Sequence, residues 1–266
     1  MKRFLIYTLL IVSLCSCGEY NRVLKSNDAN YKLDYAKRAF EQKKYSQAAT
    51  VLKDCVTEFK GSANAEESLY LLAMSYYENK DYVNSSAYFK LYAQRYPKGK
   101  YAEPAQFFCG YGYYLDSPES QLDQSPTLKA IEELQTFLDT YPRSEKVTIA
   151  QNAIFELQDK LTLKQLENAQ LYYNLGNYLG NNYESAVIVA KNAIKDYPYS
   201  KYKEQLEMLV LKARYQEAAQ SIIEKKADRF RDVIDEYYSF INNYPDSPYR
   251  EEADNILKIA QKYVKE

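Results

Sequence analysis

Tyr96-Pro97-Lys98-Gly99 belongs to a short string that decides the fold of this 266-residue chain. The string returns as Tyr141-Pro142-Arg143-Ser144, Tyr197-Pro198-Tyr199-Ser200 and Tyr244-Pro245-Asp246-Ser247, and Phe59-Lys60-Gly61-Ser62 is a degenerate copy. Proline cannot continue a helix, and Ser or Gly is a favoured N-cap. Each copy therefore predicts the end of one helix, with its Ser or Gly as the N-cap of the next.

The stretches between these strings have the apolar spacing of helices. Their apolar residues recur every three or four positions, without strand alternation and without an Asn-Gly or Asp-Gly hairpin signal. Examples are the series Leu69, Leu72, Ala73, Tyr76 and the series Leu128, Ile131, Leu134, Phe137, Leu138. The sequence predicts an all-α chain.

Repeated helix pairs of this length resemble tetratricopeptide (TPR) repeats, with Tyr in place of many of the usual Trp and Phe residues. The second unit matches best, through Leu69, Leu72, Ala73, Tyr76, Tyr82, Ser85, Phe89 and Pro97. Each pair exposes an apolar face that only a neighbouring pair can cover. We expect a superhelical solenoid of about five TPR-like helix pairs, with a capping helix within 247–264.

Two departures from the repeat shape the expected domain organisation. A polar segment at 116–126 predicts a loop inserted between the helices of the third unit. The first half of the fourth unit, 144–180, is overlong, which predicts either two helices or one long helix broken near Leu161-Thr162. We divide the repeats into N-terminal units at 31–143 and C-terminal units with the capping helix at 144–266.

The start of the chain reads as a targeting segment. A basic Met1-Lys2-Arg3 precedes the apolar run Phe4–Leu14, which is shorter than the roughly 20 residues that span a bilayer. Leu14-Cys15-Ser16-Cys17 resembles a bacterial lipobox, although an ordinary signal peptide is the alternative. The resemblance implies a lipoprotein signal peptide at 1–16, acyl chains (palmitate among them) on Cys17, and a flexible tether at 17–30. Several acyl chains anchor a protein firmly.

Composition excludes several classes of function. Lys plus Arg number 35 and Asp plus Glu number 36, giving a net charge of −1 that does not favour nucleic acid as a ligand. The chain has no His, which removes His-based catalysis and His-ligated zinc. We expect no cofactor and no metal.

Other polar motifs do not indicate catalysis. The acidic pairs Glu66-Glu67, Glu132-Glu133 and Glu251-Glu252 are adjacent on helices, so their carboxylates diverge by about 100° rather than meeting at one substrate. Gly110-Tyr111-Gly112 lacks the rest of a phosphate-loop motif. We expect a non-enzyme. Cys55 and Cys109 lie on different expected helices; burial as small apolar residues is favoured, and a disulfide stays an alternative.

Clustered tyrosines are the candidate binding residues, because Tyr offers a large rigid surface with a polar tip. The candidate peptide groove comprises Tyr76, Tyr77, Tyr111, Tyr113, Tyr114, Tyr172 and Tyr173. The alternative for each is packing between repeats.

The order of these features resembles the outer-membrane protein assembly factor BamD family. The similarity rests on the opening at 31–59, on the linker Tyr96–Glu103 with Gly110–Tyr114 and the insertion after it, and on Leu163–Tyr173. A basic position of that family falls here at or near Val189. Gly18 after the lipid cysteine favours sorting to the outer membrane.

This resemblance implies a lipoprotein on the periplasmic side of the outer membrane, within the β-barrel assembly (BAM) complex. Its C-terminal repeats would dock the barrel insertase, its N-terminal repeats would meet unfolded outer-membrane proteins, and other assembly lipoproteins would be partners. One alternative is a TPR-containing glycan-capture lipoprotein, which the absence of sugar-stacking Trp disfavours. Another is a periplasmic TPR adaptor for envelope division, which the lack of a heptad run before Tyr31 disfavours.

Overall fold

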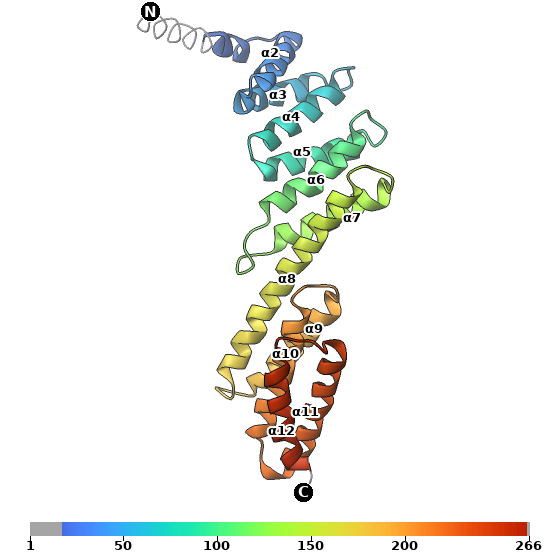
Figure 1. Ribbon diagram of the computed structural model, residues 1–266. Helices are drawn as coiled ribbons and strands as arrows, with labels where there is room; N and C mark the ends of the chain where they lie inside the picture. Colours follow the sequence, from blue (N-terminus) through green and yellow to red (C-terminus); the bar gives the residue numbers. More distant parts are fainter. Residues whose placement is uncertain (1–17, 265–266) are drawn as a thin grey trace, which may run out of the picture. The chain divides into compact units, whose positions relative to one another are not determined.

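The computed structural model describes residues 18–264 and contains only α-helices as regular elements in that range, as predicted (Figure 1). The predicted signal peptide at 1–16 and Cys17 lie outside the described residues. No helix in residues 18–264 has the length and apolar character that crossing a membrane requires. The helices are α2 (Ala29–Glu41), α3 (Tyr45–Glu58), α4 (Ala65–Glu78), α5 (Tyr82–Arg95), α6 (Ala102–Asp116), α7 (Ser125–Thr140), α8 (Val147–Leu175), α9 (Asn182–Asp196), α10 (Lys203–Ala219), α11 (Ile223–Asn243) and α12 (Arg250–Val264).

The chain forms two compact units. The N-terminal unit contains α2 to α7 and the first turns of α8, up to residue 154. The C-terminal unit contains the rest of α8 and α9 to α12, together with residues 119–124. Those loop residues belong there because Ser120 Oγ and Gln121 Nε2 donate hydrogen bonds to Glu167 of α8, at 3.1 and 2.7 Å. The division therefore falls inside α8, whereas the sequence placed it at 143/144.

Within each unit a helix packs mainly against the helices next to it in sequence. This holds for every consecutive pair from α2 to α7 and from α9 to α12. The end of α8 joins the second unit by packing Leu166, Ala169 and Tyr173 against α9 and α10. Nearest-neighbour packing of this kind is the property that defines helical-repeat proteins, and it confirms the expected TPR-like helix pairs.

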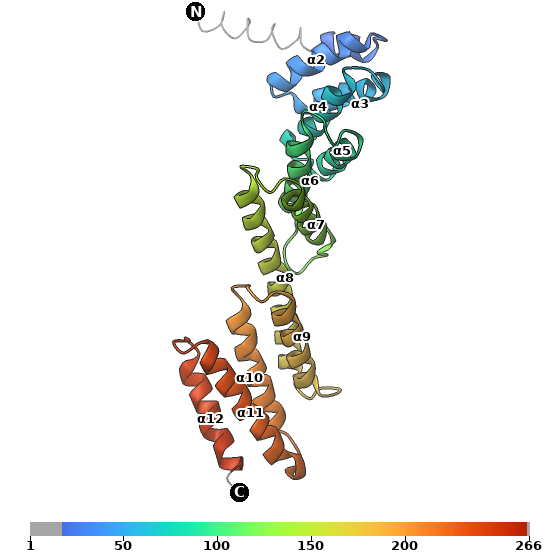
Figure 2. The same ribbon diagram turned by 90° about the vertical axis from the view of Figure 1, so that its right-hand side faces the viewer.

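The Tyr-Pro strings form one repeated turn after α5, α7, α9 and α11, whose positions can be followed in Figure 2. In each, the Tyr N–H donates to the carbonyl four residues earlier, as Tyr96 does to Tyr92 at 2.8 Å. The N–H of the Ser or Gly three residues later then donates to the Tyr carbonyl, as Ser200 does to Tyr197 at 3.2 Å. The degenerate copy at Phe59 makes the same two bonds.

The expected role of the serines in these turns is wrong in one respect. The N-cap of α10 is Tyr202, not Ser200, and Ser200 Oγ instead accepts a hydrogen bond from the Tyr202 N–H at 3.3 Å. Ser144 and Ser247 accept from Lys146 and Tyr249 in the same way. The serines therefore cap an intervening turn, and each helix begins three residues after its serine or later.

Two other expectations need correction, and one is confirmed. Residues 18–24 are helical rather than an unpatterned tether, and Val23 is fully buried in the first core cluster. α8 is a single helix without a break at Leu161-Thr162, and the buried Thr162 satisfies its hydroxyl within the helix by donating to the Gln158 carbonyl at 2.8 Å. The inserted loop lies between α6 and α7 as predicted.

Candidate protein-binding surfaces

Tyr76 and Tyr77 are adjacent on α4 but pack against different aromatic side chains. Tyr76 is buried and stacks on Tyr88 with ring centroids 5.4 Å apart, so it is a packing residue. Tyr77 is half-buried and meets the edge of Phe108 on α6 at 4.9 Å. Burial raises the pKa of Tyr77 to about 12, so its hydroxyl is a neutral donor at physiological pH.

The three tyrosines of α6 are half-buried. Tyr111 stacks on Phe107 at 5.1 Å and lies 5.1 Å from Tyr114, while Tyr113 packs against the cluster around Cys109. The N-terminal unit therefore brings Tyr77 and Tyr111 together with Tyr114 as a partly exposed aromatic surface. The charge of a Tyr111 phenolate would help to raise the Tyr77 pKa, which fits their proximity.

Tyr172 and Tyr173 lie in the C-terminal unit and also differ from one another. Tyr172 is exposed on α8. Tyr173 is half-buried, meets Tyr183 edge-on at 5.8 Å, and has the Lys212 ammonium 5.8 Å from its ring centroid. The seven candidate tyrosines are thus divided between the units, with Tyr76 committed to the core.

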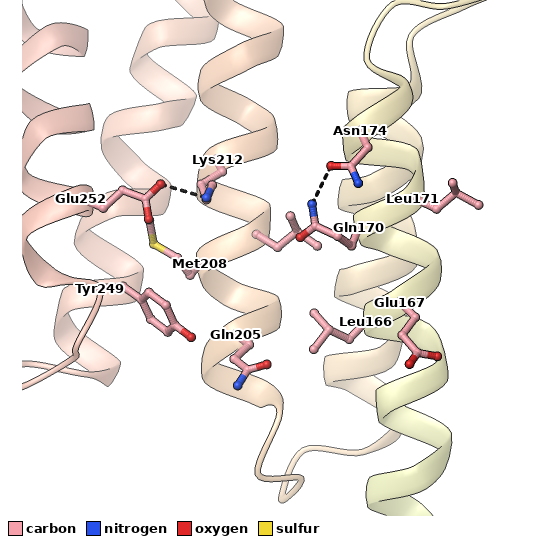
Figure 3. Close-up of a pocket in the computed structure, with 11 residues that line it drawn as sticks. Leu166, Glu167, Gln170, Leu171, Asn174, Gln205, Met208, Lys212, Tyr249 and Glu252 are labelled. Atoms are coloured by element: carbon pink, nitrogen blue, oxygen red, sulfur yellow. Dashed lines mark hydrogen bonds and ion pairs between the residues drawn. The ribbon is translucent and has the colours of Figure 1, made fainter. Parts of the chain in front are cut away.

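A cleft of about 500 Å³ opens on the C-terminal unit between α8, α10 and the start of α12 (Figure 3). Leu166 and Gln170 point from α8 towards α10, and Leu171 points away from it. Buried Met208 lies on the α10 side. The lining residues are Leu166, Glu167, Gln170, Leu171, Asn174, Gln205, Met208, Leu209, Lys212, Tyr249 and Glu252.

The polar lining of this cleft comprises three neutral amides, three charged side chains and Tyr249. Gln170 Nε2 donates to Asn174 Oδ1 at 2.9 Å along α8. Each charged side chain has a partner, since Lys212 on α10 pairs with Glu252 on α12 at 2.8 Å and Glu167 accepts from Gln121 at 2.7 Å. An apolar base with amide donors and acceptors suits a neutral polypeptide segment, whose backbone offers the matching groups. A second hollow of about 400 Å³ shares Tyr249 and Glu252 with the cleft and extends it along α12.

The acidic pairs do not converge on common sites. Glu66 accepts the Tyr92 hydroxyl, whereas Glu67 pairs with Lys37 at 2.7 Å. The buried Glu133 pairs with Lys90 at 2.5 Å, and its neighbour Glu132 is exposed. Within residues 18–264 no group of three or more His, Cys, Asp or Glu side chains could hold a metal ion.

Cys55 and Cys109, the cysteines within the described residues, are free and fully buried, as favoured from the sequence. Cys55 lies in the cluster of α2 to α4 and Cys109 in that of α4 to α6. Burial raises the pKa of Cys55 to about 11, which keeps it protonated. Both therefore act as small apolar residues.

The cleft was not found by sequence reasoning, but a signal for it exists. Residues 168–183 form a run of sixteen positions without a charged side chain, between Glu167 and Glu184. The run carries Gln170 and Asn174, which line the cleft. Uncharged amides and exposed apolar residues together on a surface helix are typical of an interface rather than of a solvated face.

The geometry defines a class, an α-helical repeat protein with a peptide-sized cleft and an aromatic surface. A family model described as YfiO, outer membrane lipoprotein, matches residues 26–180, more than half of the chain. The chain belongs to this family of outer membrane lipoproteins, which is the BamD-type family, and the resemblance seen in the sequence is confirmed.

Other comparisons add less. The solved structure of the TPR2AB-domain:pHSP90 complex of yeast Sti1 matches with a TM-score of 0.40 at 13% identity, covering 88% of this chain and 98% of that one. A search of curated proteins finds no match.

Proposed function

We propose that this chain is a non-catalytic lipoprotein scaffold of the outer-membrane β-barrel assembly complex. It is anchored through acyl chains on Cys17 to the periplasmic side of the outer membrane, and it binds the insertase, unfolded barrel precursors and other assembly lipoproteins. The family match over 26–180 is the observation that carries this proposal. Helix pairs that expose large surfaces for proteins fit a scaffold.

The two units support a division of binding. The C-terminal cleft, with its amides and its Lys212–Glu252 pair, suits a folded insertase domain that presents a loop or a strand edge. The aromatic surface of Tyr77, Tyr111 and Tyr114 suits precursor strands, which are rich in apolar and aromatic side chains. Val189, at or near the position where the family has a basic residue, packs against the second core cluster, and the nearby Lys191 pairs with Glu236 at 2.7 Å.

Site-specific photo-crosslinking in cells tests this division. A photoreactive residue at Gln205 should crosslink the insertase, and one at Tyr114 should crosslink unfolded barrel proteins. Tyr199 is the control, because it is 88% exposed on the C-terminal unit but lies outside the cleft. Crosslinks from Gln205 and Tyr114 that match those from Tyr199, or that reach only polysaccharide-uptake proteins, would contradict the proposal.

A further inference from the structure

Two loops of the C-terminal unit expose apolar side chains at one end of their helices. The α8–α9 loop carries Tyr178 and Leu179, and the latter is 91% exposed. The α10–α11 connection ends with Ile222, and α11 begins with Ile223, which is 77% exposed. The loops are adjacent, because Asn177 Nδ2 donates to Gln220 Oε1 at 2.6 Å, and both views show them at the same end of the unit (Figures 1 and 2).

The backbone around Leu179 shows that this exposure is built in. Its φ of 56° is a left-handed conformation that bulky side chains rarely adopt. The α8–α9 loop comprises 176–181, whereas the corresponding α2–α3 and α4–α5 turns comprise only 42–44 and 79–81. The longer loop thus adds an exposed apolar tip that the shorter turns lack.

The residues around these exposed side chains indicate which kind of partner surface they contact. They are exposed and line neither the cleft nor the hollow along α12. The α8–α9 loop lies within the uncharged run 168–183, and the exposed Glu224 and Lys225 follow Ile223 with opposite charges. Exposed aliphatic groups beside a Tyr and a Lys match the interface of a phospholipid bilayer.

We propose that the tips of these two loops, Tyr178-Leu179 and Ile222-Ile223, insert into the interfacial layer of a phospholipid bilayer. They form a second membrane contact, remote in sequence from the N-terminal lipid site. The family is one of outer membrane lipoproteins, which places the chain beside such a surface. This contact does not depend on the insertase being a partner.

Single tryptophans test the proposal, because the chain has none of its own. Leu179→Trp, Ile223→Trp and the control Tyr199→Trp would each be made in the full chain. The variants would be reconstituted into phosphatidylethanolamine–phosphatidylglycerol vesicles, with circular dichroism to verify folding. Tyr199 is the matched control, since it is 88% exposed and follows the other end of α9.

The expected result is a blue-shifted emission at 179 and 223, with quenching by brominated acyl chains, and neither effect at 199. Adding Ile223→Asp to the Leu179→Trp variant should reduce the quenching, because a carboxylate opposes insertion of the paired loop. Equal emission at all three positions would overturn the proposal. A shift that appears only after the insertase is added would also overturn it, because it would mark a protein interface.

Discussion

The turns that join paired helices use the same backbone device in both units but carry different chemistry. In the N-terminal unit the non-glycine residues at left-handed positions are Lys43 and Lys80, with φ of 60° and 61°. In the C-terminal unit the corresponding loop holds Leu179 at φ 56°. All three residues carry the strain of a left-handed conformation. The turns differ in the side chain that they expose, which is Lys in the N-terminal unit and Leu in the C-terminal unit.

The interiors of the two units differ as well. The N-terminal unit stacks aromatic rings and presses helices together at glycine: a Cβ at Gly110 of α6 would lie 2.8 Å from the Leu134 backbone nitrogen of α7. The C-terminal unit uses an ionic centre, in which buried Glu217 accepts from Arg214 and Asn181 at 2.9 and 2.8 Å and pairs with Arg229 at 3.3 Å. Both units bury charged side chains with partners, as Lys32 and Glu133 show for the first, so the difference lies in the helix contact at Gly110 and in the three-partner site around Glu217.

Removing the ionic centre should have the largest effect on stability. Glu217→Ala leaves Arg229 and Asn181 without their carboxylate, and we expect a loss of about 3 kcal/mol in the free energy of unfolding of the C-terminal unit. Asp228→Ala breaks only the exposed pair with Arg231 and should cost under about 0.5 kcal/mol. Urea unfolding of both variants measures this, and similar midpoints would refute the ionic account.

Gly110→Ala should cause the next largest loss of unfolding free energy, and the loss should fall on the N-terminal unit. The new methyl group meets α7 backbone that cannot rotate away, so α6 and α7 must separate, at a cost of about 2 kcal/mol. Gly18→Ala is the control, because nothing lies within 4 Å of a Cβ there. Amide hydrogen exchange should show faster opening of α6 and α7 only in the first variant; unchanged exchange would argue against close packing.

Alkaline pH should lower the unfolding free energy of the N-terminal unit, because the phenol of Tyr70 ionises less readily in the folded state. Burial raises the pKa of Tyr70 from 10.0 to about 12. Because the folded pKa is the higher one, the stabilisation is complete below pH 10 and is lost as pH rises towards 12, by roughly 2 kcal/mol for this group. Tyr70→Phe keeps the ring that stacks on Tyr101 but does not ionise. Its unfolding free energy should fall less between pH 9 and 12 than that of the wild type, and parallel curves would contradict this.

The smallest effect concerns the left-handed positions themselves. Leu179→Gly and Lys80→Gly each relieve an unfavourable conformation and should stabilise their units by up to about 1 kcal/mol. Thermal unfolding measures the gain. Only Leu179→Gly should also weaken vesicle association of the full chain, so loss of association in both variants, or in neither, would erase the difference between the units.

Much of the fold could be predicted from the sequence, because its signals are local. The Tyr-Pro strings end α5, α7, α9 and α11 through the backbone alone, and the apolar spacing fixes the helices between them. The single helix α8 and the docked Val23 could not be predicted, since both depend on tertiary burial of residues such as Thr162 that local patterns do not reveal.

The candidate surfaces were harder to predict for a related reason. The seven tyrosines were equivalent in sequence, but Tyr76 faces a core and Tyr77 a partly open layer only because they are adjacent on a helix. The cleft unites Gln170, Lys212 and Glu252 from three helices, and that juxtaposition comes from packing. The uncharged run 168–183 was the one feature of the sequence that indicated the cleft.

Purification of the full chain from outer membranes in mild detergent tests the scaffold claim most directly. The account predicts that the barrel insertase co-purifies in near-stoichiometric amount and that Glu252→Ala with Gln205→Ala, both in the cleft, reduces its recovery. A wild-type chain recovered alone, or only with polysaccharide-uptake proteins, would contradict the account.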